Sequence, residues 1–354
     1  MKNNIFKLDN PRVWRTYTGG KCIDLLHGIN GEDSHYPEEW IMSITKARNA
    51  DNDNDGSDGL SRLENGKSLL SLIESNSNSF IGKNIADTGV LIKLIDSSER
   101  LGIQVHPDKK CAKELFNSEY GKTECWYILD TRTINGIKPS IYLGFKKGIT
   151  KDYWRSLFDK QDTKSMLDCL ECFEVKKGDT FLVEGGTPHA IGSGCFLCEI
   201  QEPTDYTIRT EKVTPSGFAI DDRLCHQGIG FDKMFDVFHY DGYTRNEILD
   251  RWHIKSKVIF EDKNNKIIQK IGYDKTPCFS LEELSISTKF SINTSNSFYG
   301  LYVISGEGCI KTYKNSISIK KGDQFFVPIN CVNYVIHASK HKPLRILRFF
   351  GPNN

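Results

Sequence analysis

The sequence predicts a mainly β protein with helical insertions, organised as two related β-barrels in one chain of 354 residues. Between residues 173 and 209, short apolar strands alternate with glycine turns, a pattern typical of barrels and sandwiches. The segment Val175–Val183 then recurs as Ile319–Val327, and in each copy a Lys-Lys-Gly-Asp turn leads into an apolar strand. Aligning the copies places Asn333 where His189 stands, so only the first barrel keeps this histidine.

The repeat suggests two structural units, and the chain is long enough to bury a core in each. We expect residues 1–240 to form a catalytic unit with helical insertions and a metal site. Residues 241–354 should form a second barrel without a metal site, with a structural or oligomer-forming role. The segment His226–Phe238 should connect the two units.

Apolar spacing predicts the elements of the first unit, with strands at period two and helices at period three to four. The expected strands are Arg12–Tyr17, Glu39–Ser43 and Val90–Asp96. The expected helices are Ser68–Glu74, Asp108–Phe116 and Lys151–Cys172. Lys93 is the only charge inside the third strand before its last residue, so its ammonium group needs a partner or a ligand.

The charge balance excludes a strong overall field, because 47 Lys and Arg face 46 Asp and Glu. We therefore expect no nucleic-acid partner, and an anionic ligand must be held by a local cluster. No apolar stretch approaches the ~20 residues that span a bilayer, and the N-terminus lacks the apolar core of a signal peptide. These features predict a cytoplasmic protein without a membrane partner.

Eleven cysteines are expected to be free thiols in that reducing compartment. Two pairs, Cys169/Cys172 and Cys195/Cys198, imitate the spacing of a zinc ribbon. The second pair lies in a predicted strand, where positions three apart face opposite sides. The first pair falls at the end of a predicted helix without a glycine between its members. Small buried apolar residues are the better interpretation of both pairs.

An acidic segment, Asp51–Gly56, matches the first half of a calcium-binding EF-hand loop. The twelfth position of that loop should be a glutamate but is Arg62, and the eighth, Asp58, is not apolar. An exposed, solvated loop is therefore expected.

Four polar side chains suggest a metal site. Gln104 and His106 are two apart in an apolar run, so in a strand they share a face at roughly 6.6 Å spacing. A second strand-like run supplies Glu124, and His189 follows a Gly-Gly-Thr-Pro turn. Each residue alone is better explained as a hydrogen-bonded buried polar group. Together, two imidazoles, a carboxylate and an amide predict a site for a divalent metal.

Four motifs extend this pattern into a family resemblance. The segments Gln104–Asp108, Gly121–Tyr127, Thr187–Ala190 and Asp205–Arg209 resemble type I mannose-6-phosphate isomerases of the cupin superfamily, in their compact bacterial form. The resemblance covers most of the chain, and its specific core is residues 90–209. It implies two cupin-like jelly-roll barrels, of which the N-terminal one carries the metal site.

The resemblance also implies roles for single residues. One zinc ion per chain would be held by Gln104, His106, Glu124 and His189. The active-site arginine of the family falls on Arg209, and its two substrate-facing lysines fall on Lys93 and Lys122. The family usually has a serine that can meet the substrate phosphate two residues before the ligand glutamine. This chain has Gly102 there, which places the phosphate affinity and the preferred sugar in doubt.

The implied reaction interconverts mannose 6-phosphate and fructose 6-phosphate through an enediol(ate), whose negative charge a divalent ion stabilises. Arg209 offers a planar fork to a phosphate or an enediolate oxygen. Three candidates remain for the proton-transfer step: a hydroxide on the metal, a lysine with a lowered pKa, or Arg209 as an electrostatic partner only. For the lysines, salt bridges or extension to the barrel rim are the structural alternatives.

Two other functions fit parts of the pattern. His106, Glu124 and His189 also match the ligand set of mononuclear iron oxygenases. A non-catalytic sugar-phosphate sensor would use the same cavity without turnover. Gln104 as an extra ligand and the two lysines favour a phosphorylated sugar as substrate.

Overall fold

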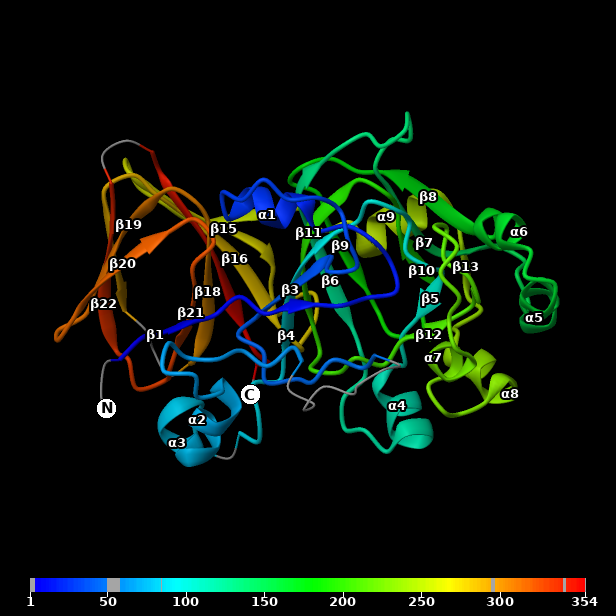
Figure 1. Ribbon diagram of the computed structural model, residues 1–354, viewed down its shortest axis with the longest axis horizontal. Coiled ribbons are helices and arrows are strands. Elements are labelled where there is room, and N and C mark those ends of the chain that lie inside the picture. Colours follow the sequence, from blue (N-terminus) through cyan, green and yellow to red (C-terminus); the bar gives the residue numbers. More distant parts are fainter. Residues whose placement is uncertain (1–3, 50–57, 84, 294–296, 340–341, 354) are drawn as a thin grey trace.

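The computed structural model describes residues 4–49, 58–83, 85–293, 297–339 and 342–353. The described chain is mainly β and forms two lobes side by side, as Figure 1 shows. The acidic segment Asp51–Gly56, for which a solvated loop is expected, lies outside the described residues.

The first lobe holds two six-stranded sheets. The first, hereafter the site sheet, has the order β2 (Arg12–Val13), β3 (Glu38–Ile41), β4 (Leu91–Asp96), β11 (Cys195–Gln201), β6 (Glu124–Thr131) and β9 (Thr180–Val183). The second has the order β12 (Ile208–Arg209), β5 (Gln104–Val105), β10 (His189–Ile191), β7 (Ser140–Lys146) and β13 (Gly242–Tyr243), with β8 (Leu170–Glu174) also paired to β7.

The second lobe holds a seven-stranded and a four-stranded sheet. The larger has the order β1 (Phe6–Leu8), β21 (Gln324–Val327), β18 (Tyr299–Ser305), β23 (Leu344–Phe350), β16 (Ser280–Ile286), β15 (Asn265–Ile271) and β14 (Lys257–Glu261). The smaller has the order β17 (Lys289–Asn293), β22 (Asn333–Ala338), β19 (Glu307–Lys311) and β20 (Ser316–Lys320). Because β1 pairs with β21, the N-terminal strand belongs to the second lobe (Figure 1).

Short helices connect and flank the strands. They are α1 (Lys21–Leu26), α2 (Leu69–Ser75), α3 (Ser77–Phe80), α4 (Lys109–Phe116), α5 (Lys151–Asp159), α6 (Thr163–Asp168), α7 (Asp222–His226), α8 (Phe231–Met234), the 3₁₀ helix η1 (Phe235–Val237) and α9 (Arg245–Trp252). The predictions of helices at Ser68–Glu74 and Asp108–Phe116 are confirmed. The side chains of Ser68 and Asp108 cap α2 and α4 by accepting a backbone N–H from the first turn.

The prediction of one helix over Lys151–Cys172 is wrong. After α5 the backbone of Gln161 adopts a left-handed conformation with φ 50°, which ends the helix. The side chain of Asp162 then accepts the backbone N–H of Ser165 at 3.1 Å and starts α6. Cys172 lies beyond both helices, in β8. The strand expected over Arg12–Tyr17 is also shorter, because β2 ends at Val13.

The two copies of the repeat have the same local structure. Gly178 and Gly322 adopt positive φ values of 97° and 91°, which glycine tolerates best. In each copy the aspartate that follows accepts a backbone N–H three residues earlier, at 3.0 and 2.9 Å. The strands β9 and β21 start directly after these aspartates. His189 and Asn333, which the alignment pairs, are the first residues of β10 and β22.

Each of the eleven cysteines lies in the described ranges and is a thiol rather than part of a disulfide. Cys169, Cys195 and Cys198 are buried, as expected, but Cys172 is exposed, because it lies on an outward position of β8 rather than in a helix. Within the described ranges, none of the cysteines joins a group of three or more potential metal ligands.

The second lobe packs on the back of the site sheet. Neighbouring strand residues face opposite sides, and in β3 Glu39 accepts a hydrogen bond of 2.6 Å from Tyr302 of β18, whereas Glu38 faces the candidate site. In β6, Tyr127 donates a hydrogen bond of 2.6 Å to Glu283 of β16. One hydrophobic core cluster contains residues of both lobes. The site sheet is therefore supported from behind by the second lobe.

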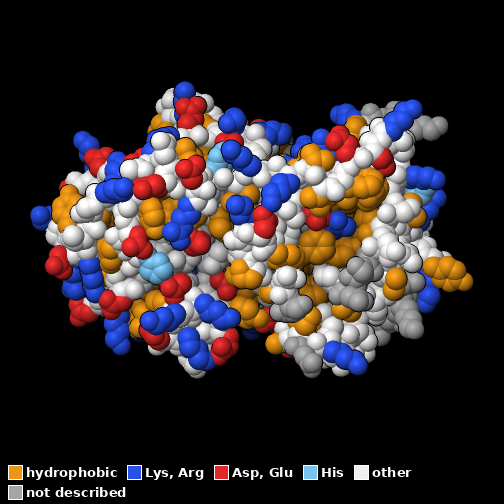
Figure 2. Space-filling view, turned by 180° about the vertical axis from the view of Figure 1, so that it is seen from behind, with side chains coloured by type: hydrophobic (Ala, Val, Ile, Leu, Met, Phe, Trp, Pro, Cys, Tyr) orange, Lys and Arg blue, Asp and Glu red, His pale blue; other side chains and the backbone are white. Residues whose placement is uncertain are grey.

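Charged side chains of both signs lie interspersed over the face seen in Figure 2, as the balanced composition leads one to expect. Among the described residues, no helix is both long enough and apolar enough to cross a membrane.

Candidate metal centre and adjoining cavity

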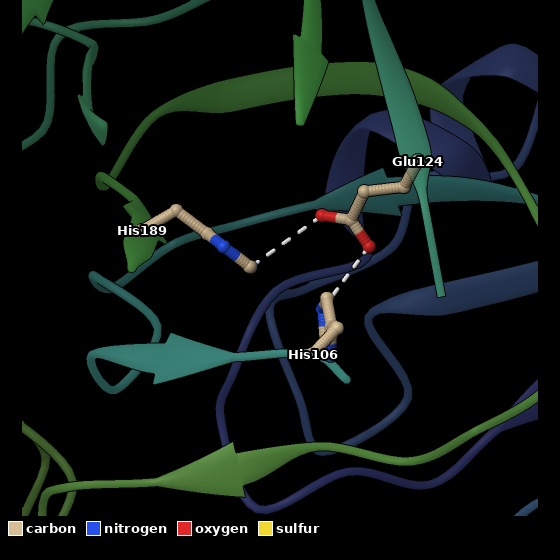
Figure 3. A group of neighbouring side chains, drawn as sticks. All are labelled: His106, Glu124 and His189. Carbon is tan, nitrogen blue, oxygen red and sulfur yellow. Dashed lines mark ion pairs between the residues drawn. The ribbon is translucent and has the colours of Figure 1, made fainter. Parts of the chain in front are cut away.

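Three of the four predicted ligands form one cluster. His106 follows β5, His189 begins β10, and Glu124 begins β6 of the site sheet, so the cluster bridges the two sheets of the first lobe. Figure 3 shows the carboxylate of Glu124 between the two imidazoles. Its Oε2 lies 3.1 Å from Nε2 of His106, and its Oε1 lies 3.5 Å from Nε2 of His189. The three side chains are at most 1% exposed, and their potential ligand atoms lie within 4.8 Å of one another.

Backbone carbonyls orient both histidines. Nδ1 of His106 lies 2.8 Å from the carbonyl oxygen of Tyr206, and Nδ1 of His189 lies 2.8 Å from that of Thr187. Because a carbonyl only accepts, each Nδ1 carries the hydrogen and each Nε2 keeps its lone pair. Metal-binding histidines are commonly oriented in this way.

Burial keeps the two imidazoles neutral. Burial first, and then the ammonium of Lys122, lower the pKa of His106 to about 3. Burial also lowers the pKa of His189. Since a metal binds neutral imidazole, both rings are in the ligating form at neutral pH.

Glu124 supplies an unsatisfied charge. Burial raises the pKa of its carboxyl, but the adjacent ammonium of Lys122 outweighs burial and holds the pKa well below its usual range. Among the residues that the structure describes, the buried Oε1 finds no hydrogen-bond partner. A buried charged oxygen without a partner is costly, and a divalent cation between the carboxylate and the imidazoles would satisfy it. The donor set and this orphaned atom both fit a metal ion.

Gln104 borders the cluster. It stands opposite His189 in the β5–β10 pair, and its amide nitrogen lies 3.2 Å from Nε2 of that histidine. An amide can present its oxygen or its nitrogen to the same neighbour, since the two ends are interchangeable by rotation. Gln104 is thus within reach as a fourth ligand.

Lys122 is in direct contact with two of the predicted metal ligands, whereas a lysine that faces only the substrate would not be. Its Nζ is 2.7 Å from Nε2 of His106 and 2.5 Å from Oε2 of Glu124. The ammonium therefore balances the charge of the buried carboxylate. Lys122 also lines the adjoining cavity.

Two glycines that sequence reasoning missed hold the backbone after His106. A Cβ on Gly121 would lie 2.8 Å from the carbonyl oxygen of Pro107, and one on Gly185 would lie 2.5 Å from Cα of Asp108. Both distances are too short for a Cβ atom. Only glycine at positions 121 and 185 therefore lets these segments approach the backbone of Pro107 and Asp108 so closely. Both glycines adjoin ligand motifs, which was a usable signal.

A cavity beside the cluster brings together the three predicted cations. Lys93, Lys122 and Arg209 line it, with Gln104 and Gly102. Arg209 stands opposite Gln104 in the β12–β5 pair, and its Nη1 donates to the carbonyl oxygens of Leu224 at 2.9 Å and Thr207 at 3.2 Å. These two bonds use only part of the five-donor fork of the guanidinium.

Lys93 has carboxylate partners as well as a place in the cavity wall. Its Nζ lies 3.4 Å from Glu199, 3.7 Å from Asp205 and 3.9 Å from Glu38. Burial lowers the pKa of Lys93, but the three carboxylates outweigh burial and raise the pKa overall. A lysine of lowered pKa is therefore not found at Lys93, because its neighbours stabilise the ammonium form.

Sequence reasoning also missed a buried ionic network in the cavity wall. Arg15 donates to both oxygens of Asp205 at 3.1 and 3.2 Å, and its Nε lies 3.0 Å from Glu38. Burial raises the pKa of Asp205, but Arg15 and Lys93 outweigh burial and keep its carboxyl ionised. Asp205 stood in a recognised motif, whereas Arg15 and Glu38 gave no local signal.

These features define a mainly β protein with a candidate metal centre beside a cavity lined by cations. Two family models match the chain: "Phosphomannose isomerase type I, catalytic domain" over residues 26–125, and "Mannose-6-phosphate isomerase, cupin domain" over residues 270–341. The matches identify the chain as a relative of the type I mannose-6-phosphate isomerases, which confirms the resemblance.

Individual proteins agree with the family models. YvyI of Bacillus subtilis, provisionally named a mannose-6-phosphate isomerase, is 29% identical over 281 residues, which cover 77% of this chain and 79% of that protein. The mannose-6-phosphate isomerase ManA of the same organism is 27% identical, over 68% of this chain and 69% of its own length. The crystal structure of the mannose 6-phosphate isomerase from Bacillus subtilis has the same fold, with a TM-score of 0.73 at 24% identity over 98% of this chain and 99% of that one.

Proposed function

We propose that the protein is a metal-dependent aldose-ketose isomerase that interconverts mannose 6-phosphate and fructose 6-phosphate through an enediol(ate). One observation carries the proposal: the buried His106–Glu124–His189 cluster, with its unsatisfied carboxylate oxygen, adjoins a cavity lined by cations. Relatives that carry the name mannose-6-phosphate isomerase support the choice of substrate.

The metal is proposed to be one zinc ion per chain, held by Gln104, His106, Glu124 and His189. Imidazole nitrogens and carboxylate oxygens are common zinc ligands. A solved mannose 6-phosphate isomerase with a TM-score of 0.69 and 14% identity is described as bound with zinc and yttrium. When bound, the ion would act as a Lewis acid toward the oxygen on which charge develops.

The side chains of the cavity then bind and orient the sugar phosphate. Arg209 offers its remaining N–H groups to phosphate or enediolate oxygens. Lys122 sits at the ligands and neutralises negative charge there, and Lys93 is a fixed cation because three carboxylates surround it. Gly102 lines the cavity without a hydroxyl, so the phosphate would rely on these cations, on backbone N–H groups or on water.

We further propose that the four sheets pair as two cupin-like jelly rolls. The boundary is best placed after α9 rather than near residue 240, because β13 pairs with β7 and α9 contacts β7 and β9. The second unit, whose described residues contain no group of three potential metal ligands, would support the site sheet from behind.

Metal removal tests the proposal as a whole. We expect release of fructose 6-phosphate from mannose 6-phosphate, loss of at least about 99% of the rate after chelation, and recovery with zinc, because several kcal/mol of charge stabilisation depend on the ion. A coupled assay with and without chelator measures this. Full activity in metal-free protein would contradict the proposal, and oxygen consumption instead of isomerisation would indicate an iron oxygenase.

Substitution of Lys122 tests its role separately from the metal. Lys122→Ala should raise the KM for mannose 6-phosphate about tenfold, by loss of a charge-assisted contact. Metal content should not fall, because the ammonium competes with a cation for the same lone pairs. Steady-state kinetics and elemental analysis measure the two effects, with the surface variant Lys177→Ala as control. If the metal is lost, Lys122 is structural.

A further inference from the structure

Trp126 connects the metal side of the site with the cavity side. It lies two residues after Glu124 in β6, so both side chains are on the same face of the site sheet. The indole is fully buried, and its ring meets the ring of His189 edge to face, with centroids 5.4 Å apart and planes inclined by 71°. This arrangement is favourable for aromatic pairs and fixes the orientation of the imidazole.

The N–H of the same indole points to the other half of the site. Nε1 of Trp126 donates a hydrogen bond of 3.0 Å to Oε2 of Glu199, which stands opposite it in β11. The second oxygen of Glu199 lies 3.4 Å from Nζ of Lys93, and both residues line the cavity. Among the described residues, the bond from the indole N–H is the one hydrogen bond that the Glu199 carboxylate accepts.

We propose that Trp126 is a positioning residue that holds the ring of His189 and the Glu199–Lys93 ion pair in one rigid arrangement. A metal bound at His189 and the ammonium of Lys93 would then contact one substrate at a fixed distance from each other. The inference rests on the proposed function, since both groups are assigned to substrate binding or metal binding there.

Trp126→Phe separates the two contacts, because it keeps an aromatic ring beside His189 and removes the N–H. The KM for mannose 6-phosphate should rise about tenfold, the effect of one buried hydrogen bond to a charged group. The kcat should change less than about threefold, and the dissociation constant of Co²⁺ less than about twofold. Kinetics on the zinc-loaded protein and titration with Co²⁺ measure these quantities.

Trp154→Phe is the matched control. Trp154 is as fully buried as Trp126, but it lies in a separate hydrophobic cluster, and its Nε1 has no hydrogen-bond partner within the described ranges. This variant should leave KM unchanged, even if it lowers the midpoint temperature of thermal unfolding. Equal KM values for the two variants would overturn the inference.

A double substitution tests the route of the effect. If Trp126 acts through Glu199 on Lys93, Trp126→Phe should no longer change KM in a Lys93→Met background. The same tenfold rise in both backgrounds would show a general structural effect and overturn the inference. Wild-type protein is assayed in parallel, so that a failure of the inference can be told from a failure of the proposed function. If the wild type does not convert mannose 6-phosphate, the proposed function is overturned, and the inference with it.

Discussion

His189→Ala is expected to remove the bound metal and to slow isomerisation by about three orders of magnitude. The imidazole is one of the three buried side chains proposed as ligands, and its Nε2 is held toward Glu124 by the carbonyl of Thr187. Without it, one imidazole remains beside the Glu124 carboxylate and the Gln104 amide, and this donor set is weaker than that of the usual zinc sites. The lost Lewis-acid stabilisation of several kcal/mol corresponds to the expected factor.

Elemental analysis of the purified variant and the coupled isomerase assay measure the two effects together. His337→Ala, in β22 of the second lobe, is the control and should keep both metal and activity. A His189→Ala protein that remains fully active after metal-free preparation would contradict the assignment of the site.

Asp205→Asn is expected to give the largest loss of stability, about 3 kcal/mol in the free energy of unfolding. The carboxylate accepts two hydrogen bonds from Arg15 and lies 3.7 Å from Lys93, and all three side chains are buried. Removing one partner from a buried ionic network leaves uncompensated charge, which costs about 3–5 kcal/mol in comparable cases. Urea unfolding measures the change. Asp236→Asn, which breaks an exposed ion pair with Lys151, should cost no more than about 1 kcal/mol.

The effect of Asp205→Asn on the free energy of unfolding should also depend on pH. Although burial raises the pKa of Asp205, Arg15 and Lys93 depress it below its unfolded value, so the folded state favours the ionised form. The resulting stability is fully present above the unfolded pKa of about 3.9 and is lost as the pH falls toward the folded pKa. The stability difference between wild type and Asp205→Asn should therefore be constant near neutral pH and shrink below about pH 4. A difference that grows on acidification would contradict this assignment.

Features encoded locally were predictable. The repeated turns were visible because a glycine at positive φ and an aspartate that accepts a nearby N–H act over only a few residues. The starts of α2 and α4 were visible because Ser68 and Asp108 are preferred capping residues. The break between α5 and α6 was missed, since it depends on a left-handed Gln161, and glutamine seldom signals that conformation.

The candidate site was predictable where its residues stand in compact motifs. Gln104, His106, Glu124 and His189 were all found in this way, and the structure places them together. Arg15 and Glu38 were missed, because only the pairing of β2, β3 and β4 brings them to Lys93. The charge state of Lys93 likewise follows from three carboxylates that are far away in sequence.

The central claim is that one cation binds between His106, Glu124 and His189. Anomalous diffraction at the zinc absorption edge, on crystals of the zinc-loaded protein, tests it most directly. We expect one strong peak about 2.0–2.2 Å from Nε2 of each histidine and from an oxygen of Glu124. A peak elsewhere in the molecule, with these three side chains still bonded only to one another and to Lys122, would contradict it.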